Sequence, residues 1–221
     1  HDLFTYSSQP PARFGLHGEF FASGRLDNLS STHAGLTAME DLADGNDLVI
    51  FAAFDHEEIG SATSSGAAGP FLGDVLERIA AVSGLGLDAT KALLARGSCV
   101  SADAGHLVHP NYPQHHDPRA QLVPGGGPML KVNASQRYAT DAVGEALWLR
   151  ACEAAGVPSQ VFVSNNAMPC GSTIGPITAT RLGIATVDVG IGLLSMHSAR
   201  EMCGADDPHH LAGALRAYLA G

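Results

Sequence analysis

Four short runs of apolar and β-branched residues alternate along this chain with longer segments of helical period, and this alternation constrains the fold most. Runs this continuous are typical of strands that are buried on both faces of a sheet. Strands that alternate with helices predict a sheet covered by helices. The expected strands are residues 48–54, 99–102, 160–164 and 184–191, and the expected helices are residues 28–43, 70–82, 88–96, 135–156, 173–182 and 207–220. The predicted fold class is α/β, a three-layer α/β/α sandwich with a mixed, largely parallel sheet.

The segment 104–131 has no strong period and contains four histidines and five prolines. A loop this long inside a compact domain usually serves a function, and this one follows a predicted buried strand. The glycine run 125–127 lacks the Gly-Lys-Ser/Thr signature of a phosphate-binding loop, so we interpret it as turn geometry. We expect His115 and His116 to lie in a solvated loop.

Charge and size limit the classes of partner. The 221 residues carry 12 Lys and Arg against 22 Asp and Glu, a formal net charge of −10. This balance gives no general attraction to nucleic acid or to an anionic membrane, so we expect neither as a partner. No apolar run approaches the roughly 20 residues that cross a bilayer. No secretion leader stands at the front of the sequence, and a cytoplasmic location is therefore predicted.

Acidic and imidazole side chains follow the predicted strands. Glu57 and Glu58 follow the first strand, Asp103 follows the second with His106, and His197 follows the fourth; Asp27 stands where the first helix begins. The carboxyl ends of strands form the binding edge of α/β sheets, so we expect these side chains to lie together.

This mixture of carboxylates and imidazole is the donor set that zinc, cobalt or manganese requires. Each residue also has an ordinary structural explanation. Asp27 could cap a helix, Glu57 and Glu58 could be surface charges, Asp103 could cap a turn, and His197 could be a hydrogen-bonded loop residue. Spacing alone leaves a metal site and a scaffold equally open.

Six ordered segments resemble the aspartyl aminopeptidase family of zinc metallopeptidases. The resemblance runs from about residue 9 to beyond His197, and six matches in the right order are highly specific. The segments are residues 23–29 (SGRLDNL), 54–61 (FDHEEIGS), 101–112 (SADAGHLVHPNY), 131–138 (KVNASQRY), 169–176 (PCGSTIGP) and 196–202 (MHSAREM).

The resemblance implies a role for each candidate residue. Asp27 would bridge two divalent metal ions, which are zinc by the resemblance, with cobalt or manganese as alternatives. Glu58 and His197 would complete one metal, and Asp103 would belong to the other. Glu57 would be the general base. The substrate would be a peptide with an acidic N-terminal residue, whose carboxylates or main chain would contact His106 and Lys131; a homo-oligomer is implied for the full-length form.

The sequence departs from the family pattern at its N-terminal side. The family places a further His ligand, and an Asp that orients the general base, in a His-x-Asp segment ahead of an inserted domain that builds the oligomer. We find no such segment before Asp27. Residues 1–221 are therefore expected to form a catalytic domain that is incomplete at its N-terminal side and lacks the insert, and this chain alone is expected to be weakly active at best.

Two alternatives to this interpretation stay open. One is a related aminopeptidase that prefers neutral N-terminal residues. The other is a catalytically inactive assembly subunit or metal-binding scaffold. A serine hydrolase is disfavoured because no Gly-x-Ser-x-Gly elbow occurs, and a mononuclear zincin is disfavoured because no His-Glu-x-x-His occurs.

Overall fold

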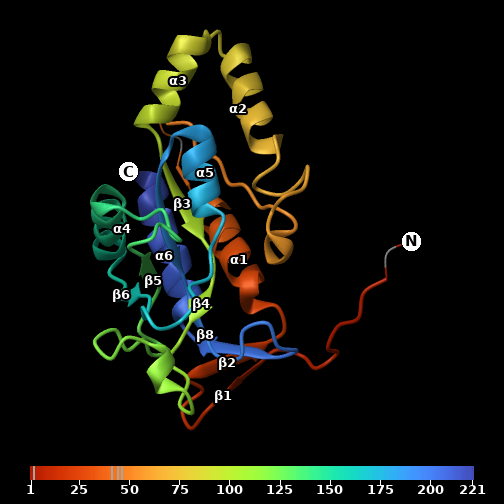
Figure 1. Ribbon diagram of the computed structural model, residues 1–221, viewed down its shortest axis with the longest axis vertical. Helices are drawn as coiled ribbons and strands as arrows, with labels where there is room; N and C mark the ends of the chain where they lie inside the picture. Colours follow the sequence, from red (N-terminus) through yellow and green to blue (C-terminus); the bar gives the residue numbers. More distant parts are fainter. Residues whose placement is uncertain (2, 41, 44, 46) are drawn as a thin grey trace.

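A four-stranded mixed sheet forms the centre of the computed structural model, which describes residues 1, 3–40, 42–43, 45 and 47–221 (Figure 1). Its strand order is β3-β7-β5-β6. β3 (Ser98–Ala102) runs parallel to β7 (Ala185–Gly190), and β6 (Gln160–Val163) runs parallel to β5 (Met129–Val132). β5 and β7 are antiparallel. Two of the three pairings are thus parallel, which confirms the prediction of a mixed, largely parallel sheet.

Helices cover both faces of β7, the most deeply buried strand of the central sheet. A Cβ atom added at Gly144 in α4 (Ala142–Ala155) would lie 3.0 Å from the Cβ of Val187. A Cβ added at Gly175 in α5 (Gly175–Leu182) would collide with the carboxylate of Asp188. Neighbouring residues of a strand point to opposite faces, so α4 and α5 lie on opposite sides of the sheet. This arrangement confirms the predicted three layers.

The helices agree with the predicted segments within a few residues, except at the start of α4. α1 (Leu26–Glu40) packs against α6 (Asp207–Ala220), and α6 packs against α4, with Leu211 and Trp148 fully buried in the core between them. α2 (Phe71–Val82) and α3 (Leu87–Arg96) form a hairpin that projects at one end of the molecule (Figure 1).

The late start of α4 has a local cause. The sequence predicts a helix over residues 135–156, but Asp141 has an extended backbone and its side chain accepts a hydrogen bond from the Gly144 N–H at 2.8 Å. Such a residue is an N-cap, so the helix begins immediately after it. The end is as predicted, because Gly156 adopts the left-handed conformation that closes a helix.

Two small sheets complete the fold. β2 (Phe20–Ser23) pairs on one side with β1 (Ala12–Phe14) and on the other with β9 (Glu201–Gly204), all antiparallel. β4 (Gly105–His106) and β8 (Gly192–Leu193) continue the direction of β3 and β7, because backbone hydrogen bonds join the two ladders. These extensions carry the chain from the central sheet to the residues described below.

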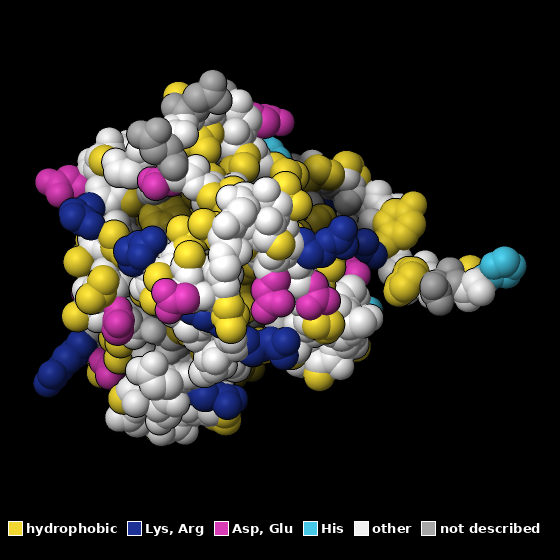
Figure 2. Space-filling model, turned by 90° about the horizontal axis from the view of Figure 1, so that it is seen from above, with side chains coloured by type: hydrophobic (Ala, Val, Ile, Leu, Met, Phe, Trp, Pro, Cys, Tyr) yellow, Lys and Arg dark blue, Asp and Glu magenta, His cyan; other side chains and the backbone are white. Residues whose placement is uncertain are grey.

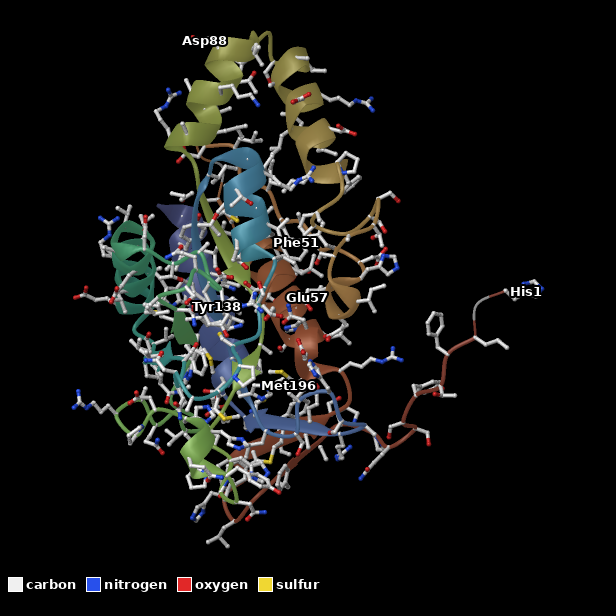
Figure 3. All side chains as sticks on the ribbon, viewed as in Figure 1. His1, Phe51, Glu57, Asp88, Tyr138 and Met196 are labelled. Atoms are coloured by element: carbon white, nitrogen blue, oxygen red, sulfur yellow. The ribbon has the colours of Figure 1, made fainter. Side chains whose placement is uncertain are left out.

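The prediction of a strand over residues 48–54 is wrong. This run has no regular secondary structure, and Leu48 and Ile50 are exposed. A strand needs a neighbour to receive its hydrogen bonds, and in the described part of the chain no strand pairs with this run. Its Phe51 ring instead lies against α1, where Gly35 leaves the necessary space (Figure 3).

The predicted loop 104–131 contains structure that the sequence did not reveal. β5 begins at Met129 inside it, and Lys131 of that strand is only 1% exposed. The expectation that His116 lies in a solvated loop is wrong. Its ring is buried, packs edge-on against Phe162 and makes a 3.0 Å hydrogen bond with the backbone oxygen of His106. His115 lies in the surface turn that precedes it.

Acidic and basic side chains are interspersed on the face of the molecule seen in Figure 2. The N-terminal segment extends away from the body in the same view, and Leu3, Phe4 and Tyr6 expose most of their surface. Among the described residues, no helix has both the length and the apolar character to cross a membrane.

Candidate metal and catalytic site

Three predicted metal ligands meet at one point. The Nε2 atom of His197 lies 3.1 Å from Oδ2 of Asp27 and 3.3 Å from Oε2 of Glu58. Donor atoms at about 2.0–2.2 Å from a tetrahedral zinc lie roughly 3.3–3.6 Å from one another. One ligand atom from each of the three residues lies within 4.8 Å of the others, and no other such group occurs among the described residues. The chain therefore brings together a donor set that fits a divalent cation.

Asp27 is placed by the junction between β2 and α1. Its backbone angles, like those of Asn28, are not helical, although the helix is counted from Leu26. The Asn28 side chain donates a 2.8 Å hydrogen bond to the carbonyl of Ala102, the last residue of β3. This bond connects the junction to the central sheet, and the Asp27 side chain is only 6% exposed.

Glu57 and Glu58 are turned toward the same cavity by a single 3-10 turn, Glu57–Ile59. His56 and Gly60, at its two ends, have positive φ angles of 64° and 100°. On a straight strand two adjacent side chains would point to opposite faces. The turn removes this restriction, so the two carboxylates can take different tasks at one site.

Asp103 follows β3, as the sequence predicts, and pairs with Lys131 of β5. The two side chains form a 3.0 Å ion pair, in which Lys131 is 2% and Asp103 16% exposed. The Lys131 ammonium also donates a 2.8 Å hydrogen bond to the carbonyl of Ala104 and lies over the ring of Tyr138. Asp103 thus lines the same cavity as the three-residue cluster, and its ion-pair partner is an ammonium group.

All seven candidate residues line one cavity of about 440 Å³. Figure 3 labels three of its lining residues, Glu57, Tyr138 and Met196, which come from three distant parts of the chain. Part of the lining comes from the loop before α5, including Pro169 and Thr173. The seven candidates are Asp27, Glu57, Glu58, Asp103, His106, Lys131 and His197.

Crowded negative charge shapes the electrostatics of this cavity. Burial, followed by the charges of Asp103 and Glu58, raises the pKa of Asp27 to about 7. The same three causes raise the pKa of Glu57. The protein alone therefore disfavours full ionisation of its carboxylates, and a bound cation would offset this repulsion. The donor types and the surplus of negative charge both fit a divalent metal ion.

His106 lies on the cavity wall at the end of β4. Burial, and then the charges of His116 and His197, lower the pKa of its imidazole. The backbone oxygen of His106 is hydrogen-bonded to the Nε2 atom of His116. The lowered pKa favours the neutral imidazole, which can both donate and accept a hydrogen bond at the cavity.

Two buried carboxylates of the site were not predicted from the sequence. Glu201 accepts hydrogen bonds from the backbone N–H groups of Asp27 and His197. Asp188 accepts them from the Thr173 hydroxyl and the Ala139 N–H, at 2.5 and 2.6 Å, and so holds Thr173, which lines the cavity. The sequence did hold a signal for them, because each carboxylate lies within or at the start of an apolar run. A charged residue that is buried in such a run must have hydrogen-bond or ion-pair partners.

Comparisons with known proteins agree with this geometry. The model of the family described as aminopeptidase I zinc metalloprotease (M18) matches residues 1–219. A probable M18 family aminopeptidase 2 of Streptomyces coelicolor is 54% identical over 222 residues, which are 99% of this chain and 51% of that protein. The chain therefore spans about half the length of the curated relatives that it matches.

Solved structures give the same result. An M18 family aminopeptidase from Thermotoga maritima superposes with a TM-score of 0.87 at 26% identity, over 97% of this chain and 49% of that one. The S. cerevisiae mApe1 dodecamer gives a TM-score of 0.83 at 29% identity, over 96% and 48%. A family match over almost every residue, with the predicted ligands gathered in one cavity, shows that this chain belongs to the aminopeptidase I zinc metalloprotease (M18) family.

Proposed function

We propose that the natural protein is a metal-dependent aminopeptidase that removes N-terminal residues from peptides and prefers Asp and Glu, with residues 1–221 as part of its catalytic domain. The observation that carries this proposal is the convergence of Asp27, Glu58 and His197 on one point of a cavity that Glu57 also lines. Membership of a zinc metalloprotease family supports the same activity.

Two divalent metal ions, zinc in the first place, are part of this proposal. Asp27 would be shared by both ions, with Glu58 and His197 on one and Asp103 on the other. Zinc supplies two effects when bound, because it lowers the pKa of water toward neutrality and polarises a carbonyl group. Asp103 lines the same cavity, where it forms a 3.0 Å ion pair with Lys131.

Glu57 is proposed as the general base. Its carboxylate lines the cavity next to the ligand Glu58 and is not one of the three clustered donors. It would accept a proton from the attacking water and pass this proton to the leaving amine, a task that requires a carboxylate at the reacting atoms.

Recognition of an acidic residue is proposed to depend on His106 and Lys131. A Lys ammonium has three N–H donors, and Asp103 and the Ala104 carbonyl account for two of them. A third N–H directed at a substrate carboxylate would form a charge-assisted hydrogen bond inside the cavity. His106 could donate a further hydrogen bond from its imidazole.

A homo-oligomeric assembly and a cytoplasmic location complete the proposal. The match to a structure described as the mApe1 dodecamer supports assembly from several copies. Neither property depends on the chemistry of the cavity.

Hydrolysis of aminoacyl p-nitroanilides by the natural full-length protein tests this function. We expect kcat/KM for the Asp and Glu substrates to exceed that for Leu and Ala by at least about tenfold. This factor corresponds to a difference of about 1.4 kcal/mol in transition-state binding. Dialysis against a chelator should abolish the activity, and added zinc should restore it.

The possible results separate the alternatives. Turnover that survives complete removal of metal would contradict a metal-dependent mechanism. A preference for Leu and Ala would leave the aminopeptidase in place and overturn the acidic specificity. Zinc binding without hydrolysis of any substrate would identify a metal-binding scaffold.

A further inference from the structure

The loops that carry Asp27 and His197 have irregular backbones. Asp27 has non-helical angles at the junction after β2, and His197 has a positive φ of 65° in the loop between β8 and β9. Backbone N–H groups in such conformations cannot use the partners that a helix or sheet ladder provides. Their positions therefore depend on other hydrogen-bond acceptors.

One buried carboxylate supplies both acceptors. Oε2 of Glu201 receives a 2.9 Å hydrogen bond from the Asp27 N–H, and Oε1 receives a 2.7 Å hydrogen bond from the His197 N–H. Glu201 is the first residue of β9 and pairs with Ser23, the last residue of β2. It is 2% exposed. Each oxygen thus holds one of two ligand-bearing loops that lie far apart in the sequence.

We propose that Glu201 is a positioning residue of the metal site, which sets the separation of the Asp27 carboxylate and the His197 imidazole by binding both backbones at once. This inference rests on the proposed metal centre and deepens it. Glu201 contributes no ligand atom to the cluster and does not line the cavity, so it acts through Asp27 and His197. Its acidic side chain also adds negative potential beside Asp27, which favours a bound cation.

A purely structural role is the competing explanation, and Asp207 offers a matched control for it. Asp207 is also buried, at 1% exposure, and its carboxylate accepts hydrogen bonds from the backbone N–H groups of Gly125, Gly127 and Gly204. None of these residues lines the cavity. Loss of Asp207 should therefore weaken the fold without affecting a metal site.

Zinc titration of the 221-residue chain, with the melting temperature of the metal-free protein measured in parallel, tests the inference. In Glu201→Gln the amide keeps one acceptor oxygen and turns an NH₂ group toward the other backbone N–H, so one loop must move. We expect the zinc affinity to fall by about tenfold or more. Asp207→Asn should lower the melting temperature and leave the zinc affinity unchanged.

Glu201→Asp provides a second variant and decides the matter if Glu201→Gln does not fold. It keeps the charge and both acceptors but is shorter by one methylene group, so an intermediate loss of zinc affinity is expected. Wild-type affinity in the folded Glu201 variants would overturn the inference, as would an equal loss in Asp207→Asn. Failure of the wild-type chain to bind zinc would instead overturn the proposed metal centre itself.

Discussion

Replacing Glu57 with Gln is expected to lower kcat by at least about a hundredfold in the natural full-length protein, because general acid–base catalysis contributes typically ~10²–10⁴-fold. The amide has nearly the same shape as the carboxylate but cannot accept a proton at neutral pH. Glu57 is not one of the three clustered donors, so zinc content should stay at the wild-type level. Hydrolysis of an aspartyl p-nitroanilide, with metal analysis of the same sample, measures both.

Glu77 provides the control for this variant. It is an exposed glutamate on α2 and does not line the cavity, so Glu77→Gln should keep wild-type kcat and zinc content. Unchanged hydrolysis in Glu57→Gln would remove Glu57 from the role of general base. Loss of zinc together with activity would show that Glu57 serves as a ligand.

Replacing Asp27 with Asn should affect metal binding most strongly. We expect the zinc affinity to fall by at least about a hundredfold, because residues that merely support a ligand already contribute ten- to a hundredfold. An amide is a weak ligand and does not bridge two cations as a carboxylate does. Zinc titration of the 221-residue chain measures this change.

The stability of the metal-free protein separates this loss from unfolding. Burial and neighbouring carboxylates raise the pKa of Asp27 to about 7, above its unfolded value. The stabilising contribution of such a group is present at low pH and is lost as the pH rises through 7. At about pH 8 the charged Asp27 therefore destabilises the metal-free fold, and Asn does not.

The metal-free Asp27→Asn variant should consequently melt no lower than the wild type at this pH. Asp88→Asn is the matched control, since Asp88 lies exposed at the distant end of the α2–α3 hairpin (Figure 3). It should leave zinc affinity unchanged. Wild-type zinc affinity in Asp27→Asn would contradict the placement of Asp27 at the metal centre.

The core of the fold was predictable because its signals are local. The run 184–191 contains the strand buried along almost all its length, and Gly156 marks the end of α4 as predicted, whereas the predicted start at residue 135 missed the N-cap Asp141. The run 48–54 has the apolar and β-branched composition that is typical of a strand. It nevertheless remains irregular, because strand formation also needs a partner elsewhere in the chain. Composition reports the preference of a segment and carries no information about its neighbour.

The candidate site was predictable from the positions of acidic and imidazole groups after strands, together with the family resemblance. The residues that support the site could not be predicted in this way. Glu201 was not singled out from the sequence, yet it is buried because it accepts hydrogen bonds from the backbones of two distant segments. The burial of His116 likewise depends on Phe162 and on the backbone of His106. Such contacts arise from the tertiary fold and have no local pattern.

Anomalous diffraction at the zinc absorption edge, from crystals of the chain grown with zinc, tests the central claim most directly. The claim predicts a peak about 2.0–2.2 Å from donor atoms of Asp27, Glu58 and His197. A second peak is expected between Asp27 and Asp103. Zinc bound elsewhere with this cavity empty, or the four side chains turned to separate surfaces, would contradict the claim.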